Sequence, residues 1–246
     1  MPSTRPAREV PDFVGPSFVR PSFVRRSARM TAGQQRAWEE HRENWVLDVP
    51  RAELDTAVAL DAHLDLPAAY GRNAPLVVEI GPGVGDSLVA MAAARPEVDV
   101  LAIEVWEPAV ARILGSLARD GVANVRLLAA DAVPALTVLI APGSVAELWV
   151  FFPDPWPKTR HHKRRLVDAA FADLAADRLQ PGGLWRLATD WAPYAEQMRA
   201  ALDDHADFVV LDVDELADLP PRPVTRFERR ALVADRTVTD LAYRRR

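Results

Sequence analysis

The feature of this sequence that most constrains its fold is the regular alternation of short apolar runs with helix-length segments from Pro75 onward. Short apolar runs predict buried strands, and longer segments closed by Gly or Pro predict helices. Strands that alternate with helices of this length form a parallel sheet with helices on both faces. We therefore predict an α/β protein with a doubly wound, mostly parallel sheet of seven strands. The predicted strands are 76–80, 98–103, 125–129, 146–152, 184–188, 208–213 and 238–243, and the predicted helices are 86–95, 107–119, 163–178 and 192–203.

The residues before Pro75 divide into two parts. Residues 1–30 are rich in Pro, Ser and Arg, and we expect a flexible basic arm there. Residues 31–70 are predicted to hold two helices, 31–44 and 51–62, the first with Thr31 and Gln34 at capping-box spacing. Together with a Rossmann-like core at 75–246 they would form one domain, 31–246, which suits the length of the chain.

The arm contains a short direct repeat, Pro-Ser-Phe-Val-Arg at 16–20 and again at 21–25. Its aromatic residues, Phe18 and Phe23, are unusual in a solvated tail. Aromatic rings among arginines can stack on nucleic-acid bases while the cations bind phosphates. Alternatively the two rings pin the arm to the domain, and the sequence leaves both interpretations open.

Charge is distributed unevenly along the chain. The net formal charge is −5, but residues 1–30 carry +4 and residues 155–165 carry +5, which leaves −14 for the rest. A polyanion would therefore dock on one face only, with an affinity that falls steeply with salt.

The composition also bounds the cellular compartment. The chain has no cysteine, which excludes disulfides and thiolate metal sites and is compatible with a reducing environment. It contains no apolar run of membrane-spanning length and no signal-peptide core. We therefore expect a soluble, cytoplasmic protein without a membrane partner.

An acidic residue lies within three positions of each of five predicted strand ends. In wound parallel sheets, ligands bind outside the carboxyl ends of the strands, so these side chains are candidates for one site. A single acid of this kind is commonly a cap or a turn residue, whereas five are hard to attribute to turns. They are Glu79, Glu104, Asp131, Asp154 and Asp190.

The glycine loop after the first strand, Gly81-Pro-Gly-Val-Gly85, would suit either NAD or S-adenosylmethionine. Asp86 stands where the dinucleotide fingerprint has its third glycine, and it places a negative charge where a pyrophosphate would bind. S-adenosylmethionine carries no phosphate but a sulfonium and an ammonium, which carboxylates suit. We therefore predict S-adenosylmethionine. Glu104 would bind the ribose, Asp131 and the backbone of Ala132 the adenine, and Glu79, beside Gly81 and Gly83, the methionine end.

The stretch 150–165 joins a carboxylate to a dense group of cations. Asp154 stands between Pro153 and Pro155. Proline restricts its own φ and holds the preceding residue extended, so few conformations are open to the acid. Five basic residues follow without an acid, and they include Lys158 and Lys163, the only two lysines of the chain. A solvated helix start would explain a basic run alone, whereas a rigid acid beside cations indicates that a polar group and a polyanion are bound at one place.

Several of these motifs together resemble the bacterial tRNA (guanine-N7-)-methyltransferase family. They are Leu76–Gly85, Ala102–Val105, Phe-Phe-Pro-Asp-Pro-Trp-Pro-Lys at 151–158 with Arg160 and His161, Ala188–Asp190, and Thr-Arg-Phe-Glu at 225–228. The resemblance covers roughly residues 18–246, and the Phe-Phe-Pro-Asp-Pro-Trp element is its most specific part. It implies a class I methyltransferase fold with the last strand antiparallel beside the fifth, S-adenosylmethionine as donor, and a guanosine of the tRNA variable loop as acceptor.

The resemblance also implies roles for individual residues. Glu79, Glu104, Asp131 and Asp154 would bind the donor, and Asp154 would also be the catalytic acid. The expected substrate-binding residues are Lys158, Asp190, Thr225, Arg226, Phe227 and Glu228. The expected RNA contacts are Arg160, His161, His162, Lys163, Arg164 and Arg165.

Guanine N7 has a lone pair and no proton, so its methylation needs no general base, and positioning and electrostatics should supply most of the rate. Asp154 would either align the guanine through its N–H groups or stabilise the positive charge that develops on the ring. Trp156 is a candidate stacking surface for the base or else an ordinary packed tryptophan. His161 and His162 lack partners at ligand spacing, so no metal is expected.

Three other functions fit parts of the pattern. A methyltransferase of a small molecule or a protein would share the fold and the donor but would not need the basic residues of 158–165. A non-catalytic RNA-binding module would have lost donor binding, which the complete glycine loop and Glu104 argue against. A nicotinamide oxidoreductase is disfavoured by Asp86. The predicted partner is therefore tRNA, bound by a monomer or a homodimer.

Overall fold

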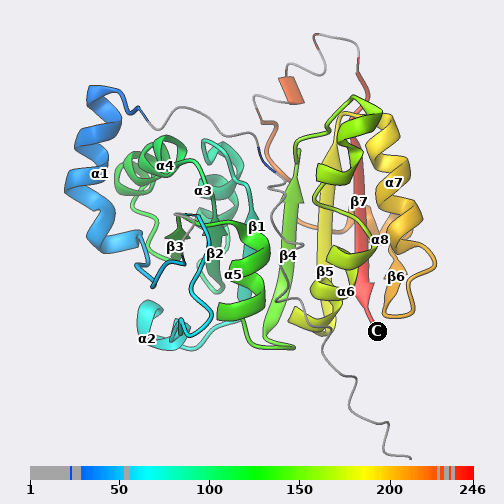
Figure 1. Cartoon of the computed structure of the whole chain (residues 1–246), viewed down its shortest axis with the longest axis horizontal. Coiled ribbons are helices and arrows are strands. Elements are labelled where there is room, and N and C mark those ends of the chain that lie inside the picture. Colours follow the sequence, from blue (N-terminus) through cyan, green and yellow to red (C-terminus); the bar gives the residue numbers. More distant parts are fainter. Residues whose placement is uncertain (1–22, 24–28, 53–55, 226–227, 230–232, 234–235) are drawn as a thin grey trace, which may run out of the picture.

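A seven-stranded sheet forms the centre of the protein in the computed structural model (Figure 1). The structure describes residue 23 and residues 29–52, 56–225, 228–229, 233 and 236–246. Most of the predicted basic arm, including Phe18, and the predicted substrate residues Arg226 and Phe227 lie outside the described residues. The strands are β1 (Leu76–Ile80), β2 (Asp99–Ile103), β3 (Val125–Leu128), β4 (Val145–Phe151), β5 (Leu179–Thr189), β6 (Phe208–Val210) and β7 (Thr239–Arg245).

The strand order is β3-β2-β1-β4-β5-β7-β6. Strands β1 to β5 are parallel, whereas β7 runs antiparallel between β5 and β6. The winding direction reverses between β1 and β4, and the crevice outside the carboxyl ends of such strands is where ligands bind in wound sheets. The predicted mostly parallel sheet of seven strands, with the last strand antiparallel beside β5, is confirmed.

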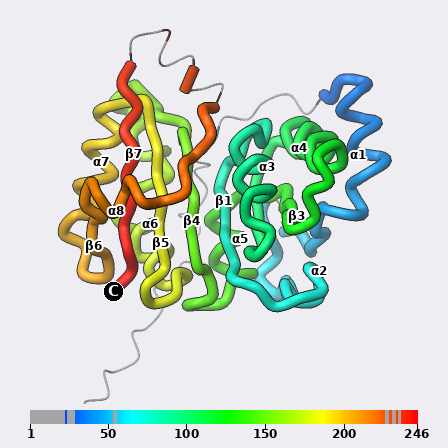
Figure 2. Tube along the Cα trace, turned by 180° about the vertical axis from the view of Figure 1, so that it is seen from behind, coloured from blue at the N-terminus to red at the C-terminus, as the bar shows by residue number. Residues whose placement is uncertain are grey.

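Helices cover both faces of the sheet, as Figure 1 and the reverse view in Figure 2 show. Helices α3 and α4 pack together on one face, with α1 against α4, and α5, α6 and α7 pack in series on the other. The helices are α1 (Ala32–Trp45), α2 (Leu66–Tyr70), α3 (Asp86–Ala93), α4 (Glu107–Asp120), α5 (Ala132–Leu139), α6 (Ala169–Arg178), α7 (Ala192–Leu202) and α8 (Val213–Ala217), with a 3-10 helix, η2 (Thr159–Arg164).

Two apolar clusters, one on each face, hold these helices to the sheet. Strand β1 is buried along its whole length because a strand covered on both faces has no solvent side. Its residue Val77 packs with Leu88 of α3 and Ile113 of α4. The next residue, Val78, belongs to the cluster on the opposite face, which includes Phe171 of α6. The continuous apolar run in the sequence thus reflects burial from two sides.

Helix α1 confirms the prediction for residues 31–44. Thr31 and Gln34 form the capping box in both directions. The side-chain amide of Gln34 also donates to the carbonyl of Pro108 at 2.7 Å. This contact attaches the start of α1 to the start of α4.

The helix predicted at 51–62 is wrong. Arg51 and Val58 instead form an antiparallel bridge, and the described residues of the segment contain no helix. The carbonyl of Thr56 accepts a hydrogen bond from the amide of Asp131 at 2.8 Å, and Arg51 donates to the carbonyl of Ala129 at 2.8 Å. The segment therefore forms a bridged turn, with the amide of Ala52 donating to the carbonyl of Ala57 at 3.0 Å, and this turn bonds to the residues after β3. The contact with residues distant in sequence is a tertiary requirement that the local pattern does not contain.

Three further boundaries differ from the prediction. Helix α5 was not predicted, because its residues are apolar on most sides and show no polar face. The helix predicted from residue 163 begins at Ala169, where Asp168 caps it by accepting from the amide of Phe171 at 2.9 Å. The strand predicted at 208–213 ends at Val210, because Asp212 and Glu215 form a capping box that starts α8.

None of the helices in the described part of the chain has the length and apolar character needed to cross a bilayer.

Gly85 offers a test of how tightly the glycine loop is packed. Gly85 and Gly121 both have positive φ, at 78° and 67°. A Cβ at Gly85 would lie 2.5 Å from Cγ1 of Ile113, whereas a Cβ at Gly121 would meet nothing within 4 Å. We expect Gly121→Ala to cost about 1–2 kcal/mol for the left-handed backbone. Gly85→Ala should cost a further ~1–3 kcal/mol for overpacking. Urea unfolding of the two variants measures the difference, and equal losses would contradict the packing argument.

Candidate functional site

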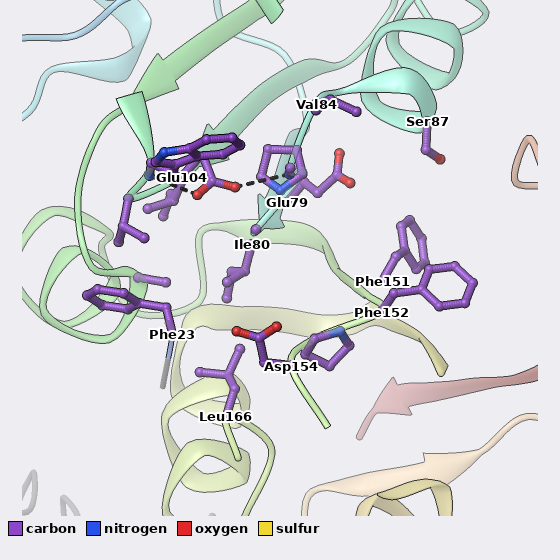
Figure 3. A pocket seen from close by; sticks show the side chains of 18 of the residues that line it. Phe23, Glu79, Ile80, Val84, Ser87, Glu104, Phe151, Phe152, Asp154 and Leu166 are labelled. Atoms are coloured by element: carbon purple, nitrogen blue, oxygen red, sulfur yellow. Dashed lines mark hydrogen bonds between the residues drawn. The ribbon is translucent and has the colours of Figure 1, made fainter. Parts of the chain in front are cut away.

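A pocket lies at the carboxyl ends of β1, β2 and β4 (Figure 3). Every residue predicted to bind the donor lines it, although their role in binding stays a prediction. The lining residues are Phe23, Glu79, Ile80, Gly81, Pro82, Gly83, Val84, Asp86, Ser87, Ile103, Glu104, Val105, Trp106, Ala130, Asp131, Ala132, Phe151, Phe152, Pro153, Asp154, Leu166 and Thr225.

Glu104, directly after β2, is held in one orientation by two backbone amides. Its Oε2 accepts from the N–H of Gly83 at 3.0 Å, and its Oε1 accepts from the N–H of Trp106 at 2.9 Å. Gly83 reaches this position with φ of 58°, a conformation that glycine adopts without steric cost. The glycine loop thus positions the carboxylate of the neighbouring strand.

Glu79, the penultimate residue of β1, is an unusual buried acid. Its side chain is only 3% exposed, and its Oε2 has no hydrogen-bond partner among the described residues. Burial raises the pKa of Glu79 to about 8; the charge of Glu104 adds to this effect, and that of Arg222 opposes it. A buried carboxyl group without a partner is costly unless a ligand supplies one. This side of the pocket therefore suits a cationic group.

Asp131 and Ala132 form the third part of the pocket, at the start of α5. The carboxylate of Asp131 caps the helix by accepting from the N–H of Val133 at 3.2 Å. Burial raises the pKa of Asp131, and the hydrogen bond from Val133 lowers it in part. Capping uses Oδ1, so Oδ2 is the atom that would accept a hydrogen bond from a ligand.

Asp154 lies across the pocket from Glu104, beside Phe23 and Leu166 (Figure 3). Proline favours an extended conformation in the residue before it. Two such residues of this loop are instead left-handed: Phe152, before Pro153, has φ of 52°, and Trp156, before Pro157, has φ of 44°. Such conformations cost on the order of 1–3 kcal/mol each and persist only where the surroundings enforce them. The restriction on Asp154 is therefore imposed by tertiary contacts as well as by proline.

Arg165 supplies part of that enforcement, which is a correction to its predicted role as an RNA contact. It is only 4% exposed, and it donates to the carbonyl of Pro155 and to the side chain of Gln197, both at 2.8 Å. Its guanidinium also lies 4.9 Å from the ring centre of Tyr194. Because it is buried in these contacts, Arg165 braces the Asp154 loop from inside instead of facing a polyanion.

The other basic residues of this stretch lie on η2, next to the Asp154 loop. Arg160 and Lys163 are exposed. The guanidinium of Arg164 lies 3.7 Å from the ring centre of Trp156, and its Nη2 donates to the carbonyl of Phe23 at 3.0 Å. The ring of His161 meets Trp156 edge-on, 5.7 Å between centres. One face of the predicted stacking surface of Trp156 is thus covered by Arg164, and His162 is half-buried on the same helix.

The predicted substrate residues are only partly gathered at the pocket. Thr225 lines it and is 9% exposed. Asp190 does not line the pocket; its carboxylate forms an ion pair with Arg236 at 2.9 Å. Lys158 is exposed and does not line the pocket either. The backbone N–H of Glu228 donates to Oγ1 of Thr225 at 3.1 Å. Its carboxylate pairs with Arg222 at 2.6 Å.

Arg222 is a residue that sequence analysis missed. Its side chain is only 5% exposed, and its guanidinium lies 5.5 Å and 5.0 Å from the ring centres of Phe151 and Phe152. The one available signal was its place in the Pro-rich link, three residues before Thr225.

Within the described part of the chain, no group of three or more His, Cys, Asp or Glu side chains is arranged to hold a metal ion.

Comparison with known proteins relates these features to methyltransferases. The family described as putative methyltransferases matches residues 73–241. A tRNA (guanine-N(7)-)-methyltransferase from a Nocardioides species is 52% identical over 221 residues, which are 90% of this chain and 85% of that protein. A protein of the same name from Cutibacterium acnes is 49% identical over 225 residues, 89% of this chain and 81% of that protein.

Solved structures show the same fold at low identity. The 16S rRNA methyltransferase KamB has a TM-score of 0.50 and 19% identity, covering 77% of this chain and 98% of that one. The antibiotic-resistance methyltransferase Kmr has a TM-score of 0.50 and 18% identity, covering 81% of this chain and 100% of that one.

The raised pKa of Glu79 predicts a dependence of stability on pH. Its pKa is about 8 in the folded chain, against an ordinary value of 4.5 for an exposed glutamate. A raised pKa in the fold means that stability is complete below the lower value and is lost as pH rises toward the higher one. Glu79→Gln, which cannot ionise, should therefore gain stability over wild type as pH rises from 5 to 9. We expect a gain in Tm on the order of 3–6 °C at pH 9, for about 1–2 kcal/mol.

Thermal unfolding at pH 5, 7 and 9 measures this effect. Glu196→Gln on the exposed side of α7 is the control, and its Tm should follow that of wild type at each pH. A Glu79→Gln curve parallel to wild type would show that the carboxyl group is not buried in the folded chain.

Proposed function

The chain belongs to the tRNA (guanine-N7-)-methyltransferase family, and we propose that it uses S-adenosylmethionine to methylate N7 of a guanosine in the variable loop of tRNA. The observation that carries the proposal is that Asp154 of the Phe-Phe-Pro-Asp-Pro-Trp element faces the pocket that Glu79 and Glu104 line. A donor site and the residue expected at the acceptor thus share one cavity. The tRNA substrate implies action in the cytoplasm.

The chemistry of the lining residues fits this donor. Glu79, with an unpartnered buried oxygen among the described residues, would bind the ammonium of the methionine end. Glu104, held by the amides of Gly83 and Trp106, would accept from the ribose hydroxyls. Asp131 and the backbone of Ala132 would bind the adenine from the start of α5. All three acids suit a ligand that carries positive charge and no phosphate.

Bound S-adenosylmethionine supplies the methyl group: a bond forms from N7 to the methyl carbon as the carbon–sulfur bond breaks with its electron pair going to sulfur. The positive charge thereby passes to the guanine ring, and no proton has to be removed. The role left to the protein is to orient the ring and to balance its new charge. Asp154 is placed for both tasks, on a loop whose backbone is restrained by Pro153 and Pro155 and braced by Arg165.

The RNA would reach the pocket over η2. Arg160 and Lys163 are exposed there for phosphates, and Arg164 and His161 pack against Trp156 of the Asp154 loop. The target guanosine would have to leave its stack to enter the pocket, at a cost of about a few kcal/mol. Thr225 forms part of the pocket wall where the base would enter.

Substitution of Asp154 tests the proposal most directly. We expect Asp154→Ala to lower kcat by about 10²–10³-fold, since it removes a group positioned on the developing charge. Asp154→Asn should keep most of the rate if Asp154 acts by orientation and lose about as much as alanine if it acts by charge. The assay uses tritiated donor and bulk tRNA, followed by nucleoside analysis for 7-methylguanosine. Asp204→Asn, an exposed acid, is the control.

Full activity of Asp154→Ala would overturn the assignment of this residue. Label recovered in another nucleoside would keep the enzyme class and refute N7 of guanine as the target. Label in a protein or a small molecule, with none in tRNA, would support the alternative methyltransferases instead.

The basic residues of η2 predict a specific dependence on salt. Arg160→Ala with Lys163→Ala removes two exposed cations, so the slope of log affinity for tRNA against log salt should fall by about one to two. Donor affinity should stay unchanged. Arg199→Ala, an exposed arginine in the last turn of α7, is the matched control. Filter binding of tRNA at several salt concentrations measures the slope, and an unchanged slope in the double variant would place the RNA on another surface.

A further inference from the structure

The face of the sheet that carries Glu79 is covered by helices only in part. Helices α3 and α4 cover β1 to β3, and the chain after α8 crosses β7 and β5 in their place before rising to the pocket, as the orange segment in Figure 2 shows. The small cluster of Leu184, Leu211 and Ala242 holds the start of this crossing to the sheet. Segment 220–225 then reaches the Phe-Phe-Pro-Asp element through Arg222, and its last residue, Thr225, lines the pocket.

Two arginines attach this segment to the sheet. Arg186 of β5 donates to the carbonyl of Pro220 at 2.9 Å. Arg222 points back onto the sheet, where it pairs with Asp240 of β7 at 3.2 Å and with Glu228 at 2.6 Å. A guanidinium can satisfy two carboxylates and two rings at once because its donors lie in one plane and its faces are free to stack. A lysine at this position could not make this set of contacts.

The ring contacts of Arg222 fall on the element that leads to Asp154. Its guanidinium lies 5.0 Å from the ring centre of Phe152, the residue with left-handed backbone directly before Pro153. A cation over an aromatic face is stabilised by the ring quadrupole, and more so when both are desolvated. Arg222 thus contacts the loop just before Asp154, at Phe152, whereas Arg165 contacts it just after Asp154, at Pro155.

Arg222 also controls the two described members of the Thr-Arg-Phe-Glu motif. Oγ1 of Thr225 is engaged by the amide of Glu228, and the carboxylate of Glu228 is engaged by Arg222. These contacts fix the position of Thr225 in the pocket wall. Glu228 is held back on Arg222, so its position depends on this ion pair.

The charge of Arg222 reaches the donor side of the pocket as well. Among the causes that act on the pKa of Glu79, burial and Glu104 raise it and Arg222 lowers it. The other acids that line the cavity are Asp86 at the start of α3, Asp131 at the start of α5 and Asp154 after β4. In this anionic surrounding, the cation Arg222 opposes the rise in the pKa of Glu79.

We propose that Arg222 is a positioning residue for methyl transfer: through Phe152 and Glu228 it holds the Asp154 loop and the Thr225 wall together at the acceptor side of the pocket. This inference rests on the proposed function. In this proposal Arg222 contacts neither the donor nor the base. The geometry and the charge of its side chain are predicted to have separable effects on catalysis and on donor binding.

Two substitutions separate these effects. Arg222→Met removes the charge and the hydrogen bonds, and Arg222→Lys keeps the charge but loses the planar set of contacts. We expect both to lower kcat for tRNA by at least tenfold, with a smaller change in KM. The pH midpoint of donor binding, followed by titration calorimetry, should move upward in Arg222→Met, because Glu79 loses its nearby cation, and should stay near wild type in Arg222→Lys.

A double-mutant cycle with Glu228→Gln tests the route of the effect. If Arg222 acts through Glu228, the loss in the double variant will be smaller than the product of the two single losses. Arg229→Met, an exposed arginine in the same segment, is the control and should retain kcat within twofold. Each variant is assayed well below its own Tm, and retained donor binding confirms that it is folded.

The outcomes are distinct for the two proposals. Wild-type protein that binds the donor but never labels tRNA refutes the proposed function, and the pH midpoint of Arg222→Met still reports on Arg222. A folded Arg222→Met variant with unchanged kcat and an unchanged midpoint overturns the positioning role. Multiplicative losses in the double variant overturn the route through Glu228.

Discussion

The site depends on a crowding of negative charge at the edge of the sheet. Glu79 and Glu104 end neighbouring strands, and Asp131 and Asp154 lie on the same pocket. The charge of Glu104 contributes to the raised pKa of Glu79, and crowded like charges destabilise a fold unless donors or cations compensate. The compensation is uneven: Glu104 receives two backbone amides, whereas Glu79 has an oxygen without a partner among the described residues. The negative charge that the protein itself does not compensate can stabilise a bound cationic donor.

The acceptor side of the pocket is rigid because of tertiary contacts and not because its backbone is intrinsically stiff. Pro153 and Pro157 alone would favour extended conformations of Phe152 and Trp156, yet both residues are left-handed. Arg165 at Pro155 and Arg222 at Phe152 are the buried side chains that hold this conformation. Arginine suits this task because its charge is permanent and its planar donors fit carbonyl groups and rings together. The preference of this chain for arginine over lysine thus has a structural use away from nucleic acid.

The sequence predicted what local pattern controls, and no more. Strands β1 to β5 and helices α3, α4 and α7 follow from apolar periodicity, glycine and caps, and the acids at the strand ends follow from the sheet topology. Segment 51–62 was mistaken for a helix because it forms a bridged turn that is attached to Ala129 and Asp131, far away in sequence. Arg165 and Arg222 were misjudged or missed for the same reason. The sequence alone does not distinguish a basic residue that faces solvent from one that donates to a buried carbonyl, because the difference depends on tertiary packing.

The two proposed ligands have opposite charge, which explains why the acid and the basic residues adjoin but do not mix. A cationic donor favours the acidic cavity, and a polyanion favours η2, where Arg160 and Lys163 are exposed. If these cations lay in the cavity they would neutralise the carboxylates, and if the acids lay on η2 they would repel phosphate. Only the few residues of the Asp154 loop separate the acidic cavity from the exposed cations of η2. A small displacement of this loop would therefore bring the acidic and basic groups together. A braced loop is therefore a requirement of the electrostatics as much as of the chemistry at the guanine.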